Sequence, residues 1–296
     1  TAHSKPNGGW GHPKDWAHCL QSRQKHIIIP SVERKSDTLS LTIKSALREF
    51  PDAKIHVFKN SDKHLIFDKM RKNNRFSNVF WYSLSDMLGQ VHIRKSKHAF
   101  QIGFDKPVAD FSKMQRKQTL DISIMLQTLK LDEDSIFTIL EDDFVSCPEA
   151  NKYVDKMIDK MERIDMNWVA LKTSFGGNGM FFRTRDMKRL GEYLMLQRNF
   201  RPFDHLLMEW YHDETPQSQN SDRFSAVGKH NLFEHIGGQL STVGHNTMAS
   251  FPKCLEQITY IFGNWQKFDM KTCGKYMISP CSKQKCAPKG EDRERI

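Results

Sequence analysis

The sequence lacks several patterns that would place it in a common class of proteins. No apolar run is long enough to span a bilayer, and no signal-peptide pattern is present. No GxGxxG motif follows the first predicted strand, which argues against a dinucleotide cofactor. No Asn-x-Ser/Thr sequon occurs, so the sequence carries no glycosylation signal of secretion. No dense block of Lys and Arg stands out, so nucleic acid is not the favoured partner.

The composition is that of a folded protein with a basic surface. The 296 residues are 38% hydrophobic and 27% charged, which allows one large α/β domain or two small ones. The net charge of +10 fits an anionic partner, and we favour a phosphorylated small molecule. Basic residues that serve only solubility are the alternative. The chain begins at Thr1 rather than Met, which is compatible with the removal of an upstream anchor or signal.

Six cysteines permit three disulfides. Four of them lie in the last fifth of the chain: Cys254, Cys273, Cys281 and Cys286. This clustering predicts a disulfide-stapled tail in an oxidising compartment. Zinc is the competing interpretation. However, Cys281 and Cys286 are too far apart for a CxxC half-site, and no second half-site has finger spacing.

An apolar run that ends in three acids is the most informative stretch. Residues 136–140 are typical of a strand buried in a parallel sheet, and Glu141, Asp142 and Asp143 follow directly. Because an unpaired carboxylate is costly to bury, we expect these acids at the carboxyl edge of the sheet, where open α/β sheets bind ligands. Hard oxygen donors there suit a divalent cation held against phosphates. A solvated acidic turn is the alternative.

Strands and helices alternate along the rest of the chain. The sequence predicts strands over 26–32, 53–58, 78–82 and 168–172, and helices over 39–50, over 113–131, from Thr184 and from Pro202. Residues 180–182 form a short apolar run. A capping-box pair, Ser146 and Glu149, predicts a further helix start. Glycines in the loop 174–179 permit close approach of a ligand. The alternation predicts an α/β fold with a mainly parallel sheet.

Four segments resemble, in the same order, segments of the N-acetylglucosaminyltransferase IV family. Ile27 to Lys35 looks like the family's first βα turn, and Arg116 to Asp121 with Ile139 to Asp143 is similar to its helix and acidic metal motif. Arg201 to Leu207 resembles its Pro-x-Asp-x-Leu-Leu segment. Leu232 to Gly237 resembles its Leu-Phe-x-His-x-Gly segment. Together the matches cover most of residues 27–245.

The resemblance implies a GT-A fold, which is a Rossmann-like, mixed, mainly parallel sheet flanked by helices. We expect an N-terminal arm over 1–25, a catalytic domain over 26–250 and a Cys-containing tail over 251–296. The implied reaction is the metal-dependent, inverting transfer of a sugar, GlcNAc from UDP-GlcNAc, to a glycan hydroxyl in N-glycan branching. The implied location is the Golgi lumen, with a membrane anchor only N-terminal to this chain and no nucleic acid as partner.

The family carries a lectin-like module after its catalytic domain, whereas only about fifty residues follow His245, too few for a typical β-sandwich. A related UDP-sugar transferase acting on a glycolipid or GPI-type glycan is therefore an alternative. More distant alternatives are a metal-dependent phosphoesterase and a carbohydrate- or nucleic-acid-binding module without catalysis. The phosphoesterase would need further His or Asp ligands from separate loops, and these are not apparent.

The resemblance also assigns roles to residues. Asp143 would be the main ligand of Mn²⁺ (or Mg²⁺), and His235 would contact the metal or the diphosphate, with His245 as the other candidate. Asp204 would be the general base; Pro202 places it in the first turn of a helix, where the macrodipole favours an ionised carboxylate. The expected donor-binding residues are Pro30, Ser31, Val32, Arg34, Asn60, Arg116, Gln118, Asp121, Glu141 and Asp142.

Overall fold

The computed structural model describes residues 23–34, 36–61, 63–73, 75–94, 112–212, 223–237, 251–258 and 268–281. Within these ranges the strands are β1 (Lys25–Ser31), β2 (Lys54–Lys59), β3 (Val79–Ser83), β4 (Ile136–Ile139), β5 (Phe144–Ser146), β6 (Ala170–Lys172), β7 (Met180–Arg183), β8 (Ala226–Gly228), β9 (Phe233–His235) and β10 (Ile278–Ser279). The helices are α1 (Thr38–Glu49), α2 (Leu65–Lys72), α3 (Lys113–Thr128), α4 (Ala150–Ile164), α5 (Met187–Gln197), α6 (Phe203–Tyr211) and α7 (Met270–Cys273), with 3₁₀ turns η2 (Leu84–Asp86), η3 (Leu88–Gln90) and η4 (Thr184–Asp186).

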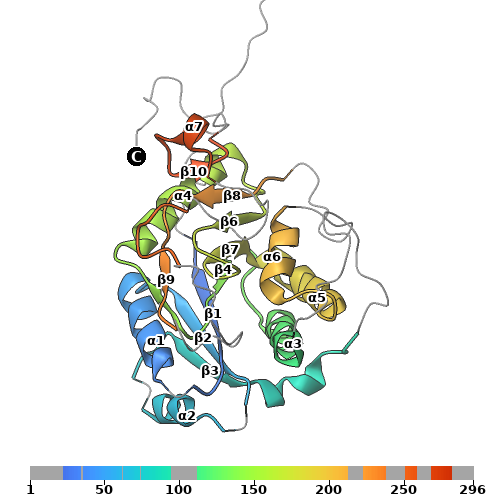
Figure 1. Cartoon of the computed structure of the whole chain (residues 1–296). Helices are drawn as coiled ribbons and strands as arrows, with labels where there is room; N and C mark the ends of the chain where they lie inside the picture. The colour runs from blue at the N-terminus through green and yellow to red at the C-terminus, as the bar shows by residue number, and fades with distance from the viewer. Residues whose placement is uncertain are drawn as a thin grey trace, which may run out of the picture.

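The main sheet has the strand order β10-β8-β6-β7-β4-β1-β2-β3 (Figure 1). β1 pairs in parallel with β2 and β4, and β2 pairs in parallel with β3. β7 runs antiparallel between β4 and β6, and β10 is antiparallel to β8. The predicted Rossmann-like, mixed and mainly parallel α/β sheet is thereby confirmed. Its strand order reverses at β1, because β2 and β3 lie on one side and β4 on the other.

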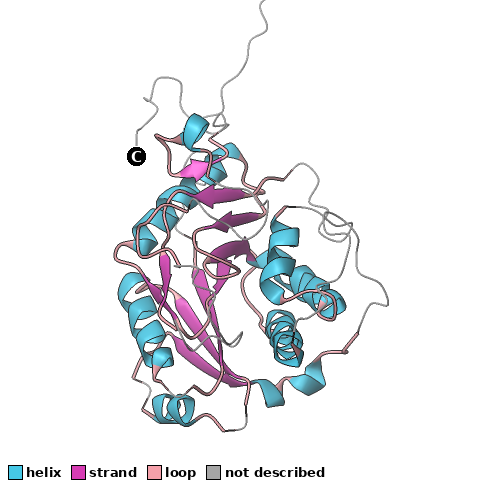
Figure 2. Ribbon diagram, viewed as in Figure 1, coloured by secondary structure: helices cyan, strands magenta, loops and turns pink. Residues whose placement is uncertain are grey.

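Helices cover both faces of this sheet, with α1, α2 and α4 on one face and α3, α5 and α6 on the other (Figures 1 and 2). Ile27 and Ile29 of β1 are buried in the core beneath α1 and α4, whereas Ile28 is buried in the core beneath α3, α5 and α6. Side chains of a strand alternate between faces, so a strand buried on both sides needs a continuous apolar run. This requirement explains the sequence of β1 and of β4.

The helix start predicted at Ser146 is wrong. Ser146 lies in β5, which pairs with β9 to form a separate two-stranded sheet, and its N–H donates to Ser45 Oγ at 2.9 Å. Helix α4 begins only at Ala150, after Glu149, which has a φ of 60° and gives no side-chain cap. The local capping pattern is overridden because β9 pairs with the backbone of residues 144–146. Thr184 likewise opens the turn η4, and α5 follows it.

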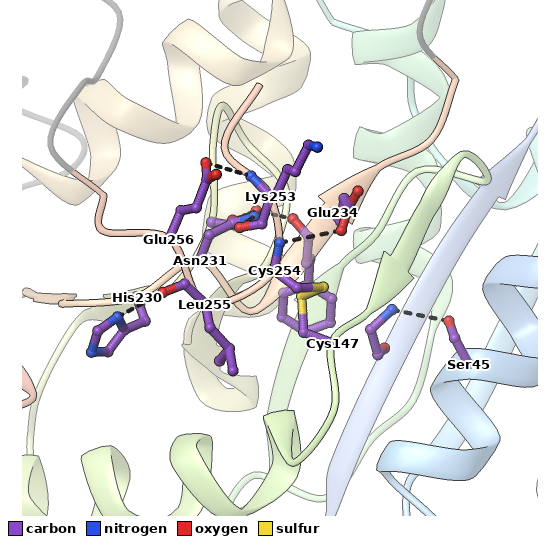
Figure 3. Close-up of a disulfide and its surroundings, with 12 residues drawn as sticks. Ser45, Cys147, His230, Asn231, Glu234, Lys253, Cys254, Leu255 and Glu256 are labelled. Carbon is purple, nitrogen blue, oxygen red and sulfur yellow. Dashed lines mark hydrogen bonds between the residues drawn. A yellow bond between two sulfur atoms is a disulfide. The ribbon is translucent and has the colours of Figure 1, made fainter. Parts of the chain in front are cut away.

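Among the described residues, two disulfides are formed, Cys147–Cys254 and Cys273–Cys281. The second staples the C-terminal region as predicted. The first links it to the connection between β5 and α4, 107 residues earlier, so the cysteines do not form a self-contained tail cluster (Figure 3). β10 also joins the main sheet through β8. His245, Cys19 and Cys286 lie outside the described residues. In the ranges given above, no helix is long and apolar enough to cross a membrane.

Candidate functional site

The carboxyl ends of β1 and β4 lie side by side where the strand order of the sheet reverses. Open α/β sheets bind their ligands at this kind of switch point. The loop after β1 contains Val32 and Arg34, and the three acids follow β4. The backbone register alone therefore brings together two segments that are about 110 residues apart.

Asp142 links these two segments. Its Oδ2 accepts hydrogen bonds from Ser31 Oγ at 2.8 Å and from the Val32 N–H at 3.0 Å, and its Oδ1 accepts from Arg34 Nε at 2.7 Å. The carboxylate is 1% exposed. We expected the acids to avoid burial, but hydrogen bonds and an ion pair satisfy this one inside the protein. Sequence reasoning missed His64, whose Nε2 lies 2.8 Å from Ser31 Oγ.

Asp143 pairs with His235. Its Oδ2 lies 3.2 Å from His235 Nε2 and 3.1 Å from Arg34 Nη1. Gly237 packs directly on this pair, since a Cβ there would lie 2.2 Å from Asp143 Oδ2 and 2.9 Å from His235 Nε2. No residue with a side chain fits that position without displacing the pair.

The carboxylates and the guanidinium influence one another. Burial alone would lower the pKa of Arg34, but the carboxylates of Asp142 and Asp143 outweigh it and raise that pKa. The guanidinium therefore stays charged. Burial raises the pKa of Asp142, and the charge of Arg34 opposes this effect.

The Asp143–His235 pair is a candidate for holding a divalent cation. Asp143 Oδ1 is buried and has no hydrogen-bond partner, and His235 Nε2 faces the same carboxylate. A carboxylate oxygen and an imidazole nitrogen are both ligands of divalent cations, so an ion that replaces the present contact would be held by Asp143 and by His235 Nε2. In the part of the chain that the structure describes, no group of three or more His, Cys, Asp or Glu side chains could hold a metal. A site with two protein ligands suits an ion that completes its shell with substrate phosphates and water.

Glu141 belongs to a second hydrogen-bond network. Its Oε1 accepts from Gln118 Nε2 at 2.6 Å, its Oε2 accepts from Asn178 Nδ2 at 2.7 Å, and its backbone N–H donates to Asn178 Oδ1 at 2.7 Å. Burial, followed by repulsion from Asp143, raises the pKa of Glu141 to about 7. Asn178 was not predicted as a site residue, although it lies in the glycine-rich loop 174–179. This network connects that loop to the end of β4.

Asp204 lies in the first turn of α6, as predicted, and its Oδ1 accepts from the His205 N–H at 3.0 Å. Gly177 of the loop 174–179 packs on it, since a Cβ there would lie 3.2 Å from Asp204 Cα. The Asp204 charge also contributes to the raised pKa of Glu141. The loop 174–179 thus contacts Glu141 through Asn178 and Asp204 through Gly177, which brings Asp204 towards the acidic edge.

Lys172 is a buried base that sequence reasoning missed. It ends β6 and is 1% exposed, and its Nζ lies 3.3 Å from Met208 Sδ on α6. Burial lowers the pKa of Lys172 to about 7, and the charge of Asp204 partly opposes this effect.

The remaining predicted residues lie around these networks. Asn60 follows β2, and its N–H donates to Ser31 O at 3.2 Å. Lys117 Nζ donates to Asn60 O at 3.3 Å and to Asp121 Oδ2 at 2.6 Å. Pro30 is a strand residue of β1, and Arg116 is exposed in the first turn of α3. A surface pocket beside α3 and α5, which includes Arg94, Lys188 and Glu192, contains none of the predicted site residues.

Comparisons with known proteins give structural similarities only. No protein-family model matches the sequence, and no curated protein matches it. Glucosyl-3-phosphoglycerate synthase from Mycobacterium tuberculosis, solved with Mn²⁺, UDP and glucosyl-3-phosphoglycerate, is similar at a TM-score of 0.40 and 11% identity, over 79% of this chain and 78% of that chain. TarS residues 1–349 from S. aureus are similar at a TM-score of 0.43 and 9% identity, over 73% and 61%. The galactosyltransferase LgtC, solved with donor and acceptor sugar analogues, is similar at a TM-score of 0.39 and 10% identity, over 62% and 69%. Because these TM-scores lie below 0.5, we infer the function from the residues of this chain.

Proposed function

We propose that this chain is a metal-dependent GT-A glycosyltransferase that moves a sugar from a UDP-sugar to a glycan hydroxyl with inversion. One observation carries the proposal. Asp143 and His235 meet at the switch point, where Asp143 Oδ1 has no partner and His235 Nε2 faces the carboxylate, next to the loop that Asp142 fixes after β1. This places candidate metal ligands where an α/β sheet presents a nucleotide diphosphate.

The residues around the pair would hold the donor. Ser31 and Val32 are fixed by Asp142, and Arg34 keeps a positive charge beside the expected diphosphate. A divalent ion on Asp143 and His235 would neutralise the charge of the leaving diphosphate. The imidazole nitrogen favours Mn²⁺ over Mg²⁺, which prefers oxygen ligands.

Asp204 would act as the general base. It accepts the proton of the acceptor hydroxyl while that oxygen bonds to the anomeric carbon and the bond from this carbon to the diphosphate oxygen breaks. Asp204 lies in the first turn of α6. Glu141 is less suited, because Gln118 and Asn178 occupy both of its oxygens.

The donor sugar, the acceptor and the compartment are proposed from the resemblance to the N-acetylglucosaminyltransferase IV family. We propose UDP-GlcNAc as the donor and N-glycan branching in the Golgi lumen as the setting, with a glycolipid or GPI-type glycan as the alternative acceptor. The two disulfides support an oxidising compartment. Among the described residues, Asp143 and His235 are two candidate ligands, whereas a two-metal phosphoesterase site needs more.

Calorimetry with UDP and Mn²⁺ tests the metal pair. We expect the protein to bind UDP only when Mn²⁺ is present, and Asp143→Asn to weaken this binding by about a hundredfold or more. Asp134→Asn is the matched control, because the Asp134 side chain is 93% exposed, and it should bind as the unchanged protein does. Equal UDP affinity of the Asp143→Asn variant would remove Asp143 from the metal site.

A transfer assay with UDP-GlcNAc and an N-glycan acceptor tests Asp204. Asp204→Asn should lower kcat by about 10²- to 10⁴-fold, the usual contribution of a general base. UDP affinity, measured by the same calorimetry, should stay nearly unchanged because Asp204 does not hold the nucleotide. A variant that keeps near-normal turnover would contradict the assignment.

A further inference from the structure

A buried histidine joins the loop after β2 to the end of β1. His64 directly precedes α2 and is 1% exposed. Its Nδ1 accepts a hydrogen bond from the Phe67 N–H at 3.2 Å, and its Nε2 lies 2.8 Å from Ser31 Oγ. One nitrogen of the imidazole therefore caps the first turn of α2, and the other nitrogen reaches a residue of the candidate site.

The helix cap fixes the tautomer of His64. A backbone N–H can only donate, so Nδ1 must present a lone pair to it. Burial lowers the pKa of His64 below its ordinary value of 6.5, and the neutral imidazole then carries its proton on Nε2. Nε2 is consequently the donor, and Ser31 Oγ the acceptor, in the contact between the two side chains.

The hydroxyl of Ser31 passes this direction on to Asp142. Ser31 is fully buried, and its Oγ lies 2.8 Å from Asp142 Oδ2. Because Ser31 Oγ accepts from His64, it can donate its own proton to Asp142. The N–H groups of Val32 and Arg34 also face the two oxygens of Asp142, so the carboxylate acts as the acceptor. The hydrogen bonds thus run in one direction, from the start of α2 to the end of β4.

Ser31 is the junction of three neighbouring strands at their carboxyl ends. β4, β1 and β2 are adjacent in the main sheet. Ser31 is the last residue of β1, Asp142 follows β4, and His64 and Asn60 follow β2. The Asn60 N–H donates to Ser31 O at 3.2 Å, so the loop after β2 holds both the backbone and the side chain of this serine. A site held in this way before a ligand arrives binds it at a lower entropic cost.

The choice of a histidine at position 64 is informative. A helix cap alone needs only a short side-chain acceptor, and Ser, Thr, Asp and Asn are the residues that usually supply it. Histidine adds a second nitrogen on the far side of its ring, and in His64 this nitrogen is used for Ser31. The contact with the candidate site is therefore the part of the arrangement that an ordinary cap would not provide.

We propose that His64 is a positioning residue for the nucleotide of the donor, which acts by donating a hydrogen bond to Ser31 and thereby holding residues 31–34 in place beside Asp142. The proposal rests on the proposed glycosyltransferase function, in which Ser31, Val32 and Arg34 hold the donor, and it extends that site to the loop after β2. Because His64 acts through Ser31, its loss should affect nucleotide binding more than the chemical step.

Two substitutions separate the two contacts of His64. His64→Asn places an amide oxygen as many bonds from Cβ as Nδ1, so it keeps the helix cap but is too short to reach Ser31. His64→Gln places an amide N–H as many bonds from Cβ as Nε2, so it keeps the donor to Ser31 but loses the cap. In calorimetry with UDP and Mn²⁺, we expect binding to be about tenfold weaker for His64→Asn and nearly unchanged for His64→Gln.

A double-mutant cycle tests whether the effect passes through the hydroxyl of Ser31. Ser31→Ala should itself weaken UDP binding, and His64→Asn should cause no further loss in the Ser31→Ala protein. In the transfer assay, His64→Asn should raise the KM for UDP-GlcNAc more than it lowers kcat. Asp269→Ala is the control for the loss of a helix cap, because Asp269 caps α7 at the opposite end of the molecule from α2 (Figure 1). It should bind UDP as the unchanged protein does.

The outcomes distinguish a positioning role from a structural one. Unchanged UDP affinity in His64→Asn, or an equal loss in the Asn and Gln variants, would show that His64 only caps α2 or fills space. Additive losses in the cycle would also overturn the proposal. Thermal melting checks that each variant is folded, and if His64→Asn is not, Ser31→Ala removes the same contact with the cap in place. These failures leave the UDP binding of the unchanged protein intact, whereas its absence with Mn²⁺ would refute the proposed function itself.

Discussion

The two sides of the candidate site are built in different ways. The sheet side consists of residues 31–34 and 141–143, which follow adjacent parallel strands. The clamp side consists of β9, the loop 174–179 and the segment 251–256. Backbone register places the sheet side, and Asp142 completes it with three hydrogen bonds. The clamp side has no such register and depends on a disulfide and on Asn231, whose side chain forms hydrogen bonds with Ser174 and Pro252. The sheet side is therefore positioned mainly by backbone pairing, whereas the clamp side is positioned by side-chain hydrogen bonds and a disulfide.

The largest effect should come from breaking the sheet side with Asp142→Ala. The change leaves Ser31 Oγ and the Val32 N–H without their acceptor and breaks a buried ion pair with Arg34. Removing one partner of a buried pair costs about 3–5 kcal/mol of unfolding free energy. Urea denaturation measures this loss, with Asp134→Asn as the control. A loss below about 1 kcal/mol, the range of an exposed pair, would show that the network contributes little.

Breaking the clamp side should lower the free energy of unfolding by a smaller amount. The effect should be confined to the residues near the disulfide. The double substitution Cys147→Ser with Cys254→Ser removes a cross-link that closes a long loop, and we expect about 2–4 kcal/mol of lost stability. Hydrogen exchange should accelerate in β9 and in residues 251–256 but not in β1 or β4. Uniform acceleration across the sheet would contradict the separation of the two sides.

The stability of the main sheet should also depend on pH, through two buried histidines, and this effect should be smaller. His26 Nδ1 lies 3.0 Å from His56 Nε2, and His56 Nδ1 lies 3.2 Å from Tyr82 Oη. Burial lowers the pKa of His26 from 6.5 to about 4 and that of His56 from 6.5 to about 3. The unfolded chain takes up protons below pH 6.5 while the native state does not, so stability falls as the pH falls towards 4.

We expect a loss of about 2 kcal/mol between pH 6.5 and 5.5 from this histidine pair. Urea denaturation at several pH values measures it. The double variant His26→Gln with His56→Gln, which cannot titrate there, should show a shallower pH dependence. An identical slope in both proteins would exclude the pair as its source.

The sheet side was largely predictable from the sequence, and the clamp side was not. The apolar run before Glu141 indicates β4, and Pro202 places Asp204 at a helix start, because both signals are local. Ser146 shows the limit of local signals, since pairing with β9 replaced the predicted cap. Asn178, Asn231 and His64 act through contacts between segments that no local pattern connects. The glycines of the loop 174–179 were interpreted as permitting the close approach of a ligand, and the pattern did not indicate that Asp204 would pack on Gly177 and Phe233 on Gly179.

The long sequence separations within the site have a consequence for how this protein matures. Asp143 and His235 are 92 residues apart, Ser174 and Asn231 are 57 apart, and Cys147 and Cys254 are 107 apart. Contacts of such high separation form late, because long segments of chain must be ordered first. Helical circular dichroism would therefore recover early during refolding. The proposed binding of UDP would recover only after the last segment has docked, so its recovery would report a correctly folded molecule.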